Sequence, residues 1–406
     1  MTYRSLRSRR TMVRMIGTTE TSDTLRVAIL PDSFKGSATA GEIAAAMGRG
    51  VKNAFSHRPE TVLVDTLPFA DGGEGTLDAV CSAWSIEPRT VRVTDALGRP
   101  AQARYAVSDD GRTGVVEAAE ANGLPQVSDV PAEPLRASTY GVGGVISAVL
   151  DAGCEEVLLC IGGSATTDGG AGLIQALGAR LVDGQGDDVA PGGAALTSLQ
   201  RVDLGGLDPR AAEVRWRIAC DVTNPLLGER GAAAVFGPQK GATAEDIEVL
   251  ERGLTRFAEV LASHQGRDDR DLPGMGAAGG MPLALKSLFG AELVPGGDLV
   301  ADALGAVPIL STADLVLTGE GRLDSQSLQG KVVDTVRRMT PAGTPVIVVA
   351  GAVELGPEHL RSAGITAAFS IASGAQRLEE LQATALERLE VTCEQIVAVY
   401  LSSRRW

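Results

Sequence analysis

Five polar, glycine-rich segments each follow a strand-like apolar run, and they hold most of the residues that could do chemistry. They are PDSFKGS after LRVAIL, PFADGGEGT after TVLVDTL, GSATTDGGAG after EVLLCIG, DVTNPLLG after VRWRIAC, and EGRLDSQSLQGK after DLVLTG. Ligands of open α/β sheets bind beyond the carboxyl ends of the strands. The recurrence therefore predicts one composite site, at a cleft between two domains.

The first segment places Asp32, Ser33 and Lys35 at a strand-to-helix turn. A lysine there can reach a phosphate or carboxylate, and the N-terminus of the following helix adds unpaired N–H donors. A Pro-Asp turn with a solvated lysine explains the same residues equally well.

The second segment surrounds Asp71 and Glu74 with glycines, of which Gly72 and Gly73 lie between the two carboxylates. Glycine lets the backbone approach a ligand closely, and a carboxylate can hold Mg²⁺ or accept a hydroxyl proton. The density of glycines favours a functional loop over a turn with an N-capping aspartate.

The third segment contains Gly162, Gly163 and Ser164 in a loop that enters a helix, which is typical of an anion cradle. Asp168 fits either a ligand or a helix cap. The loop is not a Walker A motif, because GxxxxGK[ST] is absent from the chain.

The last two segments add further polar candidates. Asp221 and Asn224 follow a strand, and Lys240 stands on the Gly-flanked loop GPQKGAT. A further set comes at the end of another buried strand and consists of Gly319, Glu320, Arg322 and Asp324. An Asp-capped helix with a surface ion pair is a competing explanation for these residues. A GxGxxG match at residues 274–279 has no strand before it, so it does not predict a dinucleotide site.

Apolar runs of strand length alternate with helical patterns along the chain. Helices are predicted over 39–55, with Thr39 as N-cap and Glu42 at the capping-box spacing, over 245–264, and as one long helix over 376–402. Antiparallel strands are predicted between residues 89 and 119. The pattern predicts an α/β fold of two domains, with a Rossmann-like parallel-sheet domain built from both chain ends and an inserted mixed α/β domain.

The predicted domain bounds are 25–75 and 291–406 for the discontinuous parallel domain and 76–290 for the insert. Residues 1–24 are basic and polar and lack an apolar core, so a disordered N-terminal extension is expected rather than a secretory signal.

Composition excludes several classes of function. The net charge of -14 disfavours nucleic acid and anionic membranes as partners. The five cysteines form no CxxC pair and predict reduced thiols in a cytoplasmic protein. The three histidines are scattered, which leaves no material for a histidine-based metal site or a catalytic triad.

Six long motifs in register resemble the bacterial type I glycerate kinase family. They are PDSFKGS, PFADGGEGT, IGGSATTDGGAG, CDVTNPLLGERGAAAVFGPQKGAT, GMGAAGG and TGEGRLDSQSLQGK, spread over residues 25–350. The resemblance implies ATP-dependent phosphorylation of D-glycerate, in bacterial members mainly at the 2-hydroxyl, with Mg²⁺ and an active site between two α/β domains.

Roles for single residues follow as hypotheses from the chemistry of phosphoryl transfer, which needs positioning and charge neutralisation more than covalent chemistry. Asp71 is the candidate base. The candidates for binding anionic groups are Lys35, Lys240 and Arg322, and those for Mg²⁺ are Asp221, Glu320 and Asp324. The catalytic set is Asp71, Lys35, Asp221 and Arg322, and the remaining substrate or ATP contacts are Asp32, Ser33, Gly72, Gly73, Gly162, Gly163, Ser164, Asp168, Asn224 and Gly319.

Three alternatives stay open at this point: a kinase of another small hydroxy acid, a glycerate 3-kinase, and a non-catalytic small-molecule sensor on the same fold. The retained charged residues argue against the sensor. The sequence does not determine the oligomeric state, so a homo-oligomer is one option.

Overall fold

Short runs of valine, isoleucine and leucine form a parallel sheet from the two ends of the chain. A computed structural model describes residues 24–58 and 60–403, so the predicted N-terminal extension lies, except for Thr24, outside the described residues. The sheet has the order β13-β12-β11-β1-β2. Its strands are β1 (Thr24–Ile29), β2 (Thr61–Thr66), β11 (Leu315–Leu323), β12 (Val346–Val353) and β13 (Ala367–Ser370).

Helices cover both faces of this sheet, because its central strands are apolar on both sides. One face packs against α1 (Ala40–Asn53) and α15 (Ala385–Ser403). Arg49 on α1 reaches Glu390 on α15, 341 residues along the chain, with Nε 2.7 Å from Oε2. The other face packs against α2 (Thr76–Trp84), α10 (Gly296–Leu304), α11 (Ala306–Thr312) and α12 (Val332–Met339).

Two predictions about helices have different outcomes: one concerns the start of α1 and the other the continuity of the C-terminal helix. The capping box is confirmed: the Glu42 N–H donates to Thr39 Oγ1 at 3.3 Å, and Thr39 N–H donates to Glu42 Oε2 at 2.9 Å. The single helix over 376–402 is wrong, since α14 (Leu378–Ala383) and α15 are separated at Thr384. Thr384 has φ −110° and ψ 9°, and its hydroxyl donates to the Glu380 carbonyl at 2.8 Å, which competes with regular helix geometry.

The middle of the chain forms a second, mixed sheet of order β10-β9-β6-β5-β4-β3. The pairs β3/β4 and β4/β5 are antiparallel, as predicted, and the remaining pairs are parallel. The strands are β3 (Arg89–Thr94), β4 (Pro100–Val107), β5 (Thr113–Glu117), β6 (Glu156–Cys160), β9 (Arg215–Ala219) and β10 (Glu292–Val294).

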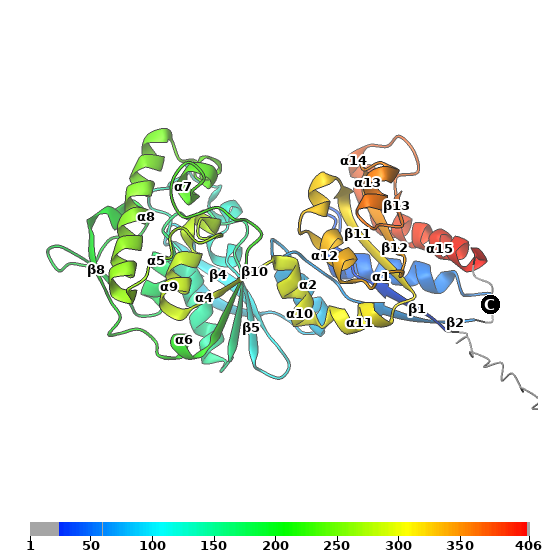
Figure 1. Cartoon of the computed structure of the whole chain (residues 1–406), viewed down its shortest axis with the longest axis horizontal. Coiled ribbons are helices and arrows are strands. Elements are labelled where there is room, and N and C mark those ends of the chain that lie inside the picture. Colours follow the sequence, from blue (N-terminus) through cyan, green and yellow to red (C-terminus); the bar gives the residue numbers. More distant parts are fainter. Residues whose placement is uncertain (1–23, 59, 404–406) are drawn as a thin grey trace, which may run out of the picture.

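The core of this second lobe lies between the sheet and a group of helices, with Trp216 and Phe257 among its largest buried side chains. The helices are α4 (Tyr140–Asp151), α5 (Ala171–Ala176), α7 (Ala232–Phe236), α8 (Ala244–Gln265) and α9 (Pro282–Phe289). A separate antiparallel pair is formed by β7 (Arg180–Asp183) and β8 (Leu199–Asp203), and β8 lies at the outer end of this lobe (Figure 1).

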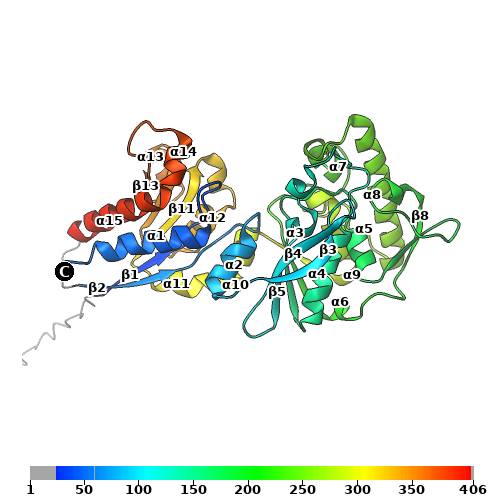
Figure 2. The same cartoon turned by 180° about the vertical axis from the view of Figure 1, so that it is seen from behind.

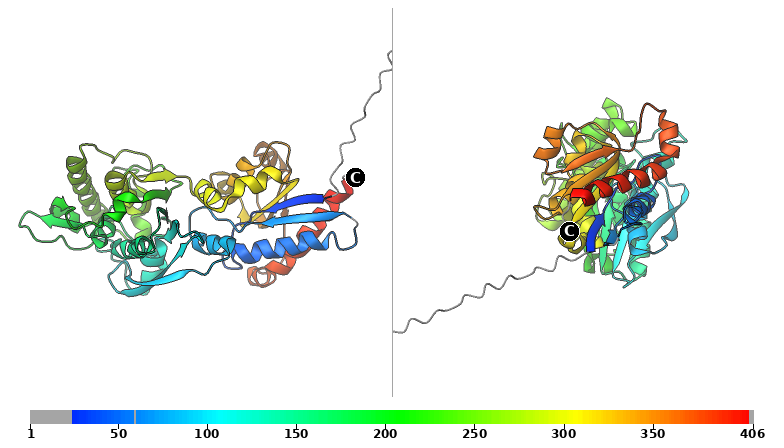
Figure 3. Two further views of the ribbon diagram at one scale, coloured as in Figure 1. Left: turned by 90° about the horizontal axis from the view of Figure 1, so that it is seen from below. Right: turned by 90° about the vertical axis from the view of Figure 1, so that its right-hand side faces the viewer.

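The two lobes lie end to end, and α2 and α10 lie between them (Figures 1 and 2). One buried cluster joins Leu77 of α2 and Leu299 of α10 to Val316 of the first sheet and Leu158 of the second. The described part of the C-terminal helix ends beside the start of β1, at the end of the molecule remote from the second lobe (Figure 3).

The predicted α/β fold, with a parallel sheet from both chain ends and a separate mixed sheet from the middle, is confirmed. The domain bounds stay a prediction. The predicted insert ends at residue 290, whereas β10, which begins at Glu292, still pairs with β9 of the mixed sheet. None of the helices within residues 24–58 and 60–403 is long and apolar enough to cross a bilayer.

Candidate active site

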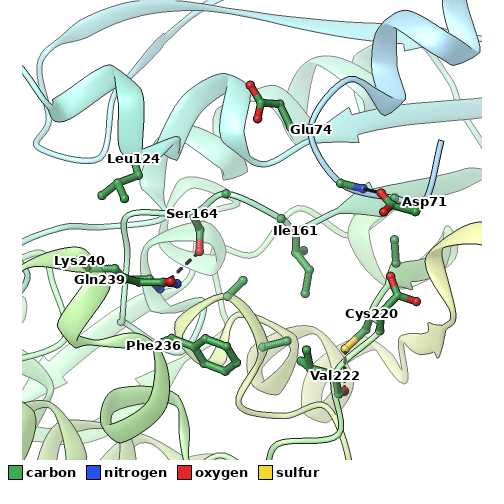
Figure 4. A pocket seen from close by; sticks show the side chains of 18 of the residues that line it. Asp71, Glu74, Leu124, Ile161, Ser164, Cys220, Val222, Phe236, Gln239 and Lys240 are labelled. Carbon is green, nitrogen blue, oxygen red and sulfur yellow. Dashed lines mark hydrogen bonds between the residues drawn. The ribbon is translucent and has the colours of Figure 1, made fainter. Parts of the chain in front are cut away.

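A cleft of about 570 Å³ opens where the loop after β2 faces the loops after β6 and β9 (Figure 4). Three of the predicted segments line it: those after β2, β6 and β9. Most other lining residues belong to the second lobe, and the predicted ones on its wall are Asp71, Gly72, Gly73, Gly162, Gly163, Ser164, Asp221 and Lys240.

Two carboxylates, Asp71 and Asp221, lie at one end of the cleft. Asp71 Oδ1 accepts the Gly73 N–H at 3.0 Å, and Asp221 Oδ1 accepts the Gly296 N–H at 2.9 Å. A Cβ on Gly296 would lie only 1.8 Å from the Asp71 carbonyl oxygen, so glycine is required for this approach. Burial raises the pKa of Asp221, and the neighbouring charge of Asp71 raises it further.

Two more carboxylates lie at the first sheet. The Asp32 N–H donates to the Gly319 carbonyl at 2.8 Å, which ties the segment after β1 to the middle of β11. The strand predicted to end at Gly319 in fact continues to Leu323, so Glu320 and Arg322 are part of β11 and do not follow it. Burial raises the pKa of Asp32 to about 6, with Asp71 adding to the effect. Burial likewise raises the pKa of Glu320 to about 7, and the charge of Asp32 contributes.

Glu320 also carries an unsatisfied acceptor. Its Oε1 is buried and has no hydrogen-bond partner among the residues that the structure describes. An unpaired buried carboxylate oxygen is costly, and a cation or a hydrogen-bond donor placed against it would remove that penalty.

Backbone rather than side chains forms the middle of the cleft. Gly163 has φ +72°, and a Cβ on Gly162 would lie 3.2 Å from Gly73 Cα. The loops after β2 and β6 therefore approach each other where neither has a side chain. This exposes peptide groups to whatever occupies the cleft, as in known anion-binding loops.

Lys240 lies at the far end of the cleft from Asp71, and only 4% of it is exposed. Its Nζ donates to the Thr166 carbonyl at 2.6 Å and lies 3.4 Å from Ser164 Oγ. Burial lowers the pKa of the Lys240 amine to about 8, against the attraction of the Asp168 charge.

Several predicted contacts do not line the cleft. Asp32, Gly319 and Glu320 lie at the first sheet, and Asp168 and Asn224 are paired elsewhere. The Asp168 carboxylate is buried and accepts from Thr139 N–H at 2.8 Å, Thr139 Oγ1 at 2.9 Å, and two further N–H groups at the start of α5. It thus acts as a helix cap, the second of its two predicted roles. The Asn224 amide donates to the Arg230 carbonyl at 2.8 Å and does not line the cleft.

Arg322 and Asp324 are likewise occupied elsewhere. The Arg322 side chain is 66% exposed, with its nearest carboxylate that of Glu354 at 3.5 Å. Asp324 Oδ1 caps the turn 325–328 by accepting the Gln326 N–H at 2.8 Å. The structure does not assemble the predicted Mg²⁺ ligands: within the described ranges, no group of three or more His, Cys, Asp or Glu is placed to hold a metal.

A second hollow of about 660 Å³, here called the side cavity, shares Glu74, Pro125 and Gly163 with the cleft. Ser33 and Lys35 line it, and Lys35 Nζ lies 4.0 Å from Glu74 Oε2. The two predicted segments after β1 and β2 therefore meet, but around a neighbouring hollow rather than in the cleft.

Sequence reasoning missed several lining residues. Glu117, the last residue of β5, lines the side cavity and accepts the Leu77 N–H of α2 at 2.7 Å, a contact with no local signal in the sequence. Phe236 and Gln239 line the cleft. Both residues belong to the sequence motif that contains Lys240, and closeness to Lys240 in the sequence is the signal that could have indicated them.

The comparisons with known proteins agree with this architecture. Residues 27–401 match the model of the glycerate kinase family. The chain is 44% identical to the glycerate kinase of Bacillus subtilis, over 92% of this chain and 97% of that protein. It is 42% identical to the glycerate 2-kinase of Escherichia coli, over 88% and 93%. A crystal structure described as a candidate glycerate kinase 2 of Salmonella typhimurium LT2 superposes with a TM-score of 0.83 at 43% identity, covering 93% and 99%.

Fold and site together define a two-lobed α/β enzyme with a glycine-lined cleft that bears carboxylates at one end and a buried lysine at the other. With its match over nearly the whole length, the chain belongs to the glycerate kinase family and is a kinase.

Proposed function

We propose that this protein transfers the γ-phosphoryl group of ATP to the 2-hydroxyl of D-glycerate, with Mg²⁺, in the cytoplasm. The observation that carries the proposal is the cleft itself, in which Asp71 and Asp221 lie opposite Lys240 along a glycine-lined wall. The name of the Escherichia coli relative supports the 2-hydroxyl as the acceptor.

Asp71 is the proposed base for the glycerate hydroxyl. Its carboxylate lines the cleft, and one oxygen is oriented by the Gly73 N–H while the other is available to a substrate. A base within hydrogen-bond reach of the hydroxyl needs this combination of fixed orientation and access.

The residues present fit Mg²⁺ only together with a nucleotide. Asp221 lies beside Asp71 in the cleft and has a raised pKa, so a cation bound there would offset the repulsion between the two carboxylates. Glu320, whose buried Oε1 has no partner among the described residues, does not line the cleft. Mg²⁺ commonly takes one or two carboxylates and completes its shell with water and phosphate oxygens. When bound, it neutralises charge on the transferred phosphoryl group.

Lys240 and the peptide groups of residues 162–164 are proposed to bind anionic groups in the cleft, and Lys35 to do so in the side cavity. Arg322, Asp324, Asn224 and Asp168 are left out of the proposed chemistry, because their side chains lie outside the cleft or are already paired.

The test is ADP release by the purified protein with Mg-ATP and D-glycerate, run in parallel with enolase added directly. Both signals together support the 2-kinase, since enolase accepts 2-phosphoglycerate without a mutase. ADP release without an enolase signal indicates the 3-phosphate. Absence of ADP release contradicts the proposal and directs a panel of other hydroxy acids, then glycerate binding without turnover as expected of a sensor.

A further inference from the structure

The end of the cleft that contains Lys240 is apolar apart from that lysine, Ser164 and Gln239. Its wall is formed by Leu124, Pro125 and Phe236 together with the loop at Ala277 and Ala278. From this composition we infer that the adenine base of ATP binds here, in the second lobe, between Leu124 and Phe236. The inference rests on the proposed use of ATP.

The side chains are placed to hold a flat ring. In Figure 4, Leu124 and Phe236 lie on opposite sides of the opening, and Gln239 lies between them at its end. Neither Leu124 nor Phe236 is fully buried, so each keeps apolar surface that a ligand can cover. The exposed Gln239 amide can both donate to and accept from the edge of a base.

The backbone behind this wall is held in an unusual conformation. Ala278 has φ 48°, a left-handed conformation that non-glycine residues rarely adopt. The next residue, Gly279, has φ +70°, and a Cβ there would lie 2.0 Å from the Thr166 carbonyl oxygen. The loop therefore packs directly against Thr166, whose carbonyl accepts the Lys240 hydrogen bond, and this contact fixes Ala278 on the wall of the cleft. Strain of this kind is concentrated at ligand sites.

The chemistry of the two substrates decides which one suits this end. Every carbon of glycerate carries oxygen, so glycerate gains little from Leu124 and Phe236. Adenine has two apolar faces, and stacking on an aromatic ring contributes beyond the area buried. With the base between Leu124 and Phe236, the triphosphate begins beside Lys240 and Ser164 and follows the loop 162–164 toward Asp71 and Asp221, where the transfer takes place. The volume of about 570 Å³ lies in the usual range for such ligands.

The experiment compares Phe236→Ala with Val235→Ala, its neighbour on α7. Val235 is 43% exposed and does not line the cleft, so it controls for a change in the helix. Isothermal titration with Mg-ADP, without glycerate, is combined with the KM of each substrate. We expect Phe236→Ala to weaken ADP binding about tenfold and to raise the KM for ATP by about the same factor. The KM for glycerate should stay within twofold, and Val235→Ala should match the parent protein.

Unchanged ADP affinity in Phe236→Ala overturns the inference while leaving the proposed function intact, and so does a rise confined to the KM for glycerate. Phe236-dependent ADP binding without phosphorylation of glycerate upholds the inference and defeats the proposed substrate. A parent protein that binds no ADP defeats the inference. If Phe236→Ala fails to fold, the partly exposed Leu124→Ala gives the same comparison.

Discussion

Replacing Lys240 by methionine removes the buried cation of the cleft while keeping most of its volume. Burial lowers the pKa of Lys240 from its ordinary 10.5 to about 8, which corresponds to about 3 kcal/mol against the charged form at neutral pH. That penalty is complete below pH 8 and vanishes as the pH rises toward 10.5. Methionine removes it but leaves the Thr166 carbonyl without its donor, at a cost of roughly 1–3 kcal/mol. The two effects nearly cancel, so Lys240→Met should fold.

Activity responds differently, because a charge-assisted hydrogen bond to an anionic ligand has no substitute in methionine. Such a bond contributes roughly 1.5–3 kcal/mol, so kcat/KM should fall roughly 10- to 150-fold. In the parent protein, kcat/KM should also decline above about pH 8, as Lys240 loses its proton. Lys240→Met should lack this alkaline decline.

The assay is ADP release from pH 6 to 9.5 at subsaturating ATP and then at subsaturating glycerate, with melting temperatures measured in the same buffers. Lys52→Met, on the exposed side of α1, controls for loss of a positive charge. The reasoning is refuted if Lys240→Met keeps kcat/KM within twofold and retains the alkaline decline.

Three further predictions concern other parts of the molecule. Asp71→Asn should lower kcat by roughly 10²-fold or more with little change in the affinity for ADP, measured by ADP release and titration calorimetry; near-normal turnover would rule out Asp71 as the base. Glu320→Gln should leave stability unchanged below pH 4.5 and raise it by up to about 3 kcal/mol at pH 8 without ligands. The pKa of Glu320 is raised from 4.5 to about 7 in the folded state, so the charged carboxylate destabilises that state increasingly as the pH rises from 4.5 to 7. Urea unfolding at both pH values checks this. Trp216→Ala should cost roughly 3–5 kcal/mol in urea unfolding, because Trp216 is 2% exposed, stacks on Phe289 at 5.4 Å and donates to the Ala211 carbonyl; a loss below 1 kcal/mol would contradict this account of the core.

Local patterns were sufficient for most elements of the fold. The strand β1 follows from the apolar run Leu25–Leu30, which only Arg26 interrupts, and the start of α1 follows from the spacing of Thr39 and Glu42. The break at Thr384 could not be predicted, since threonine is tolerated in helices and only its hydrogen bonds to the backbone and to Arg388 reveal the interruption.

The site was predictable to the level of loops but not of side-chain orientation. The position of Asp71 in the cleft followed from the rule that ligands bind beyond strand ends. In the sequence, Asp168 and Asp324 look as suitable for a ligand site as Asp71 does. In the structure, both carboxylates instead accept backbone N–H groups at the start of a helix or turn. For Asp168 a long-range contact adds to the local ones, since Thr139, which donates to Asp168, lies 29 residues away.

The order of strands in the parallel sheet has a consequence for synthesis on the ribosome. β1 lies between β2 and β11, and Val27 is in register with both Val64 and Leu315. β2 ends at Thr66, whereas β11 begins at Leu315, so the second neighbour of β1 emerges tens of seconds later at ordinary rates of translation. During that interval the nascent chain carries β1 with one open edge, while the middle of the chain can already assemble its own sheet. The larger lobe should therefore fold first, and the smaller lobe should close around the open edge only when the last quarter of the chain has been made.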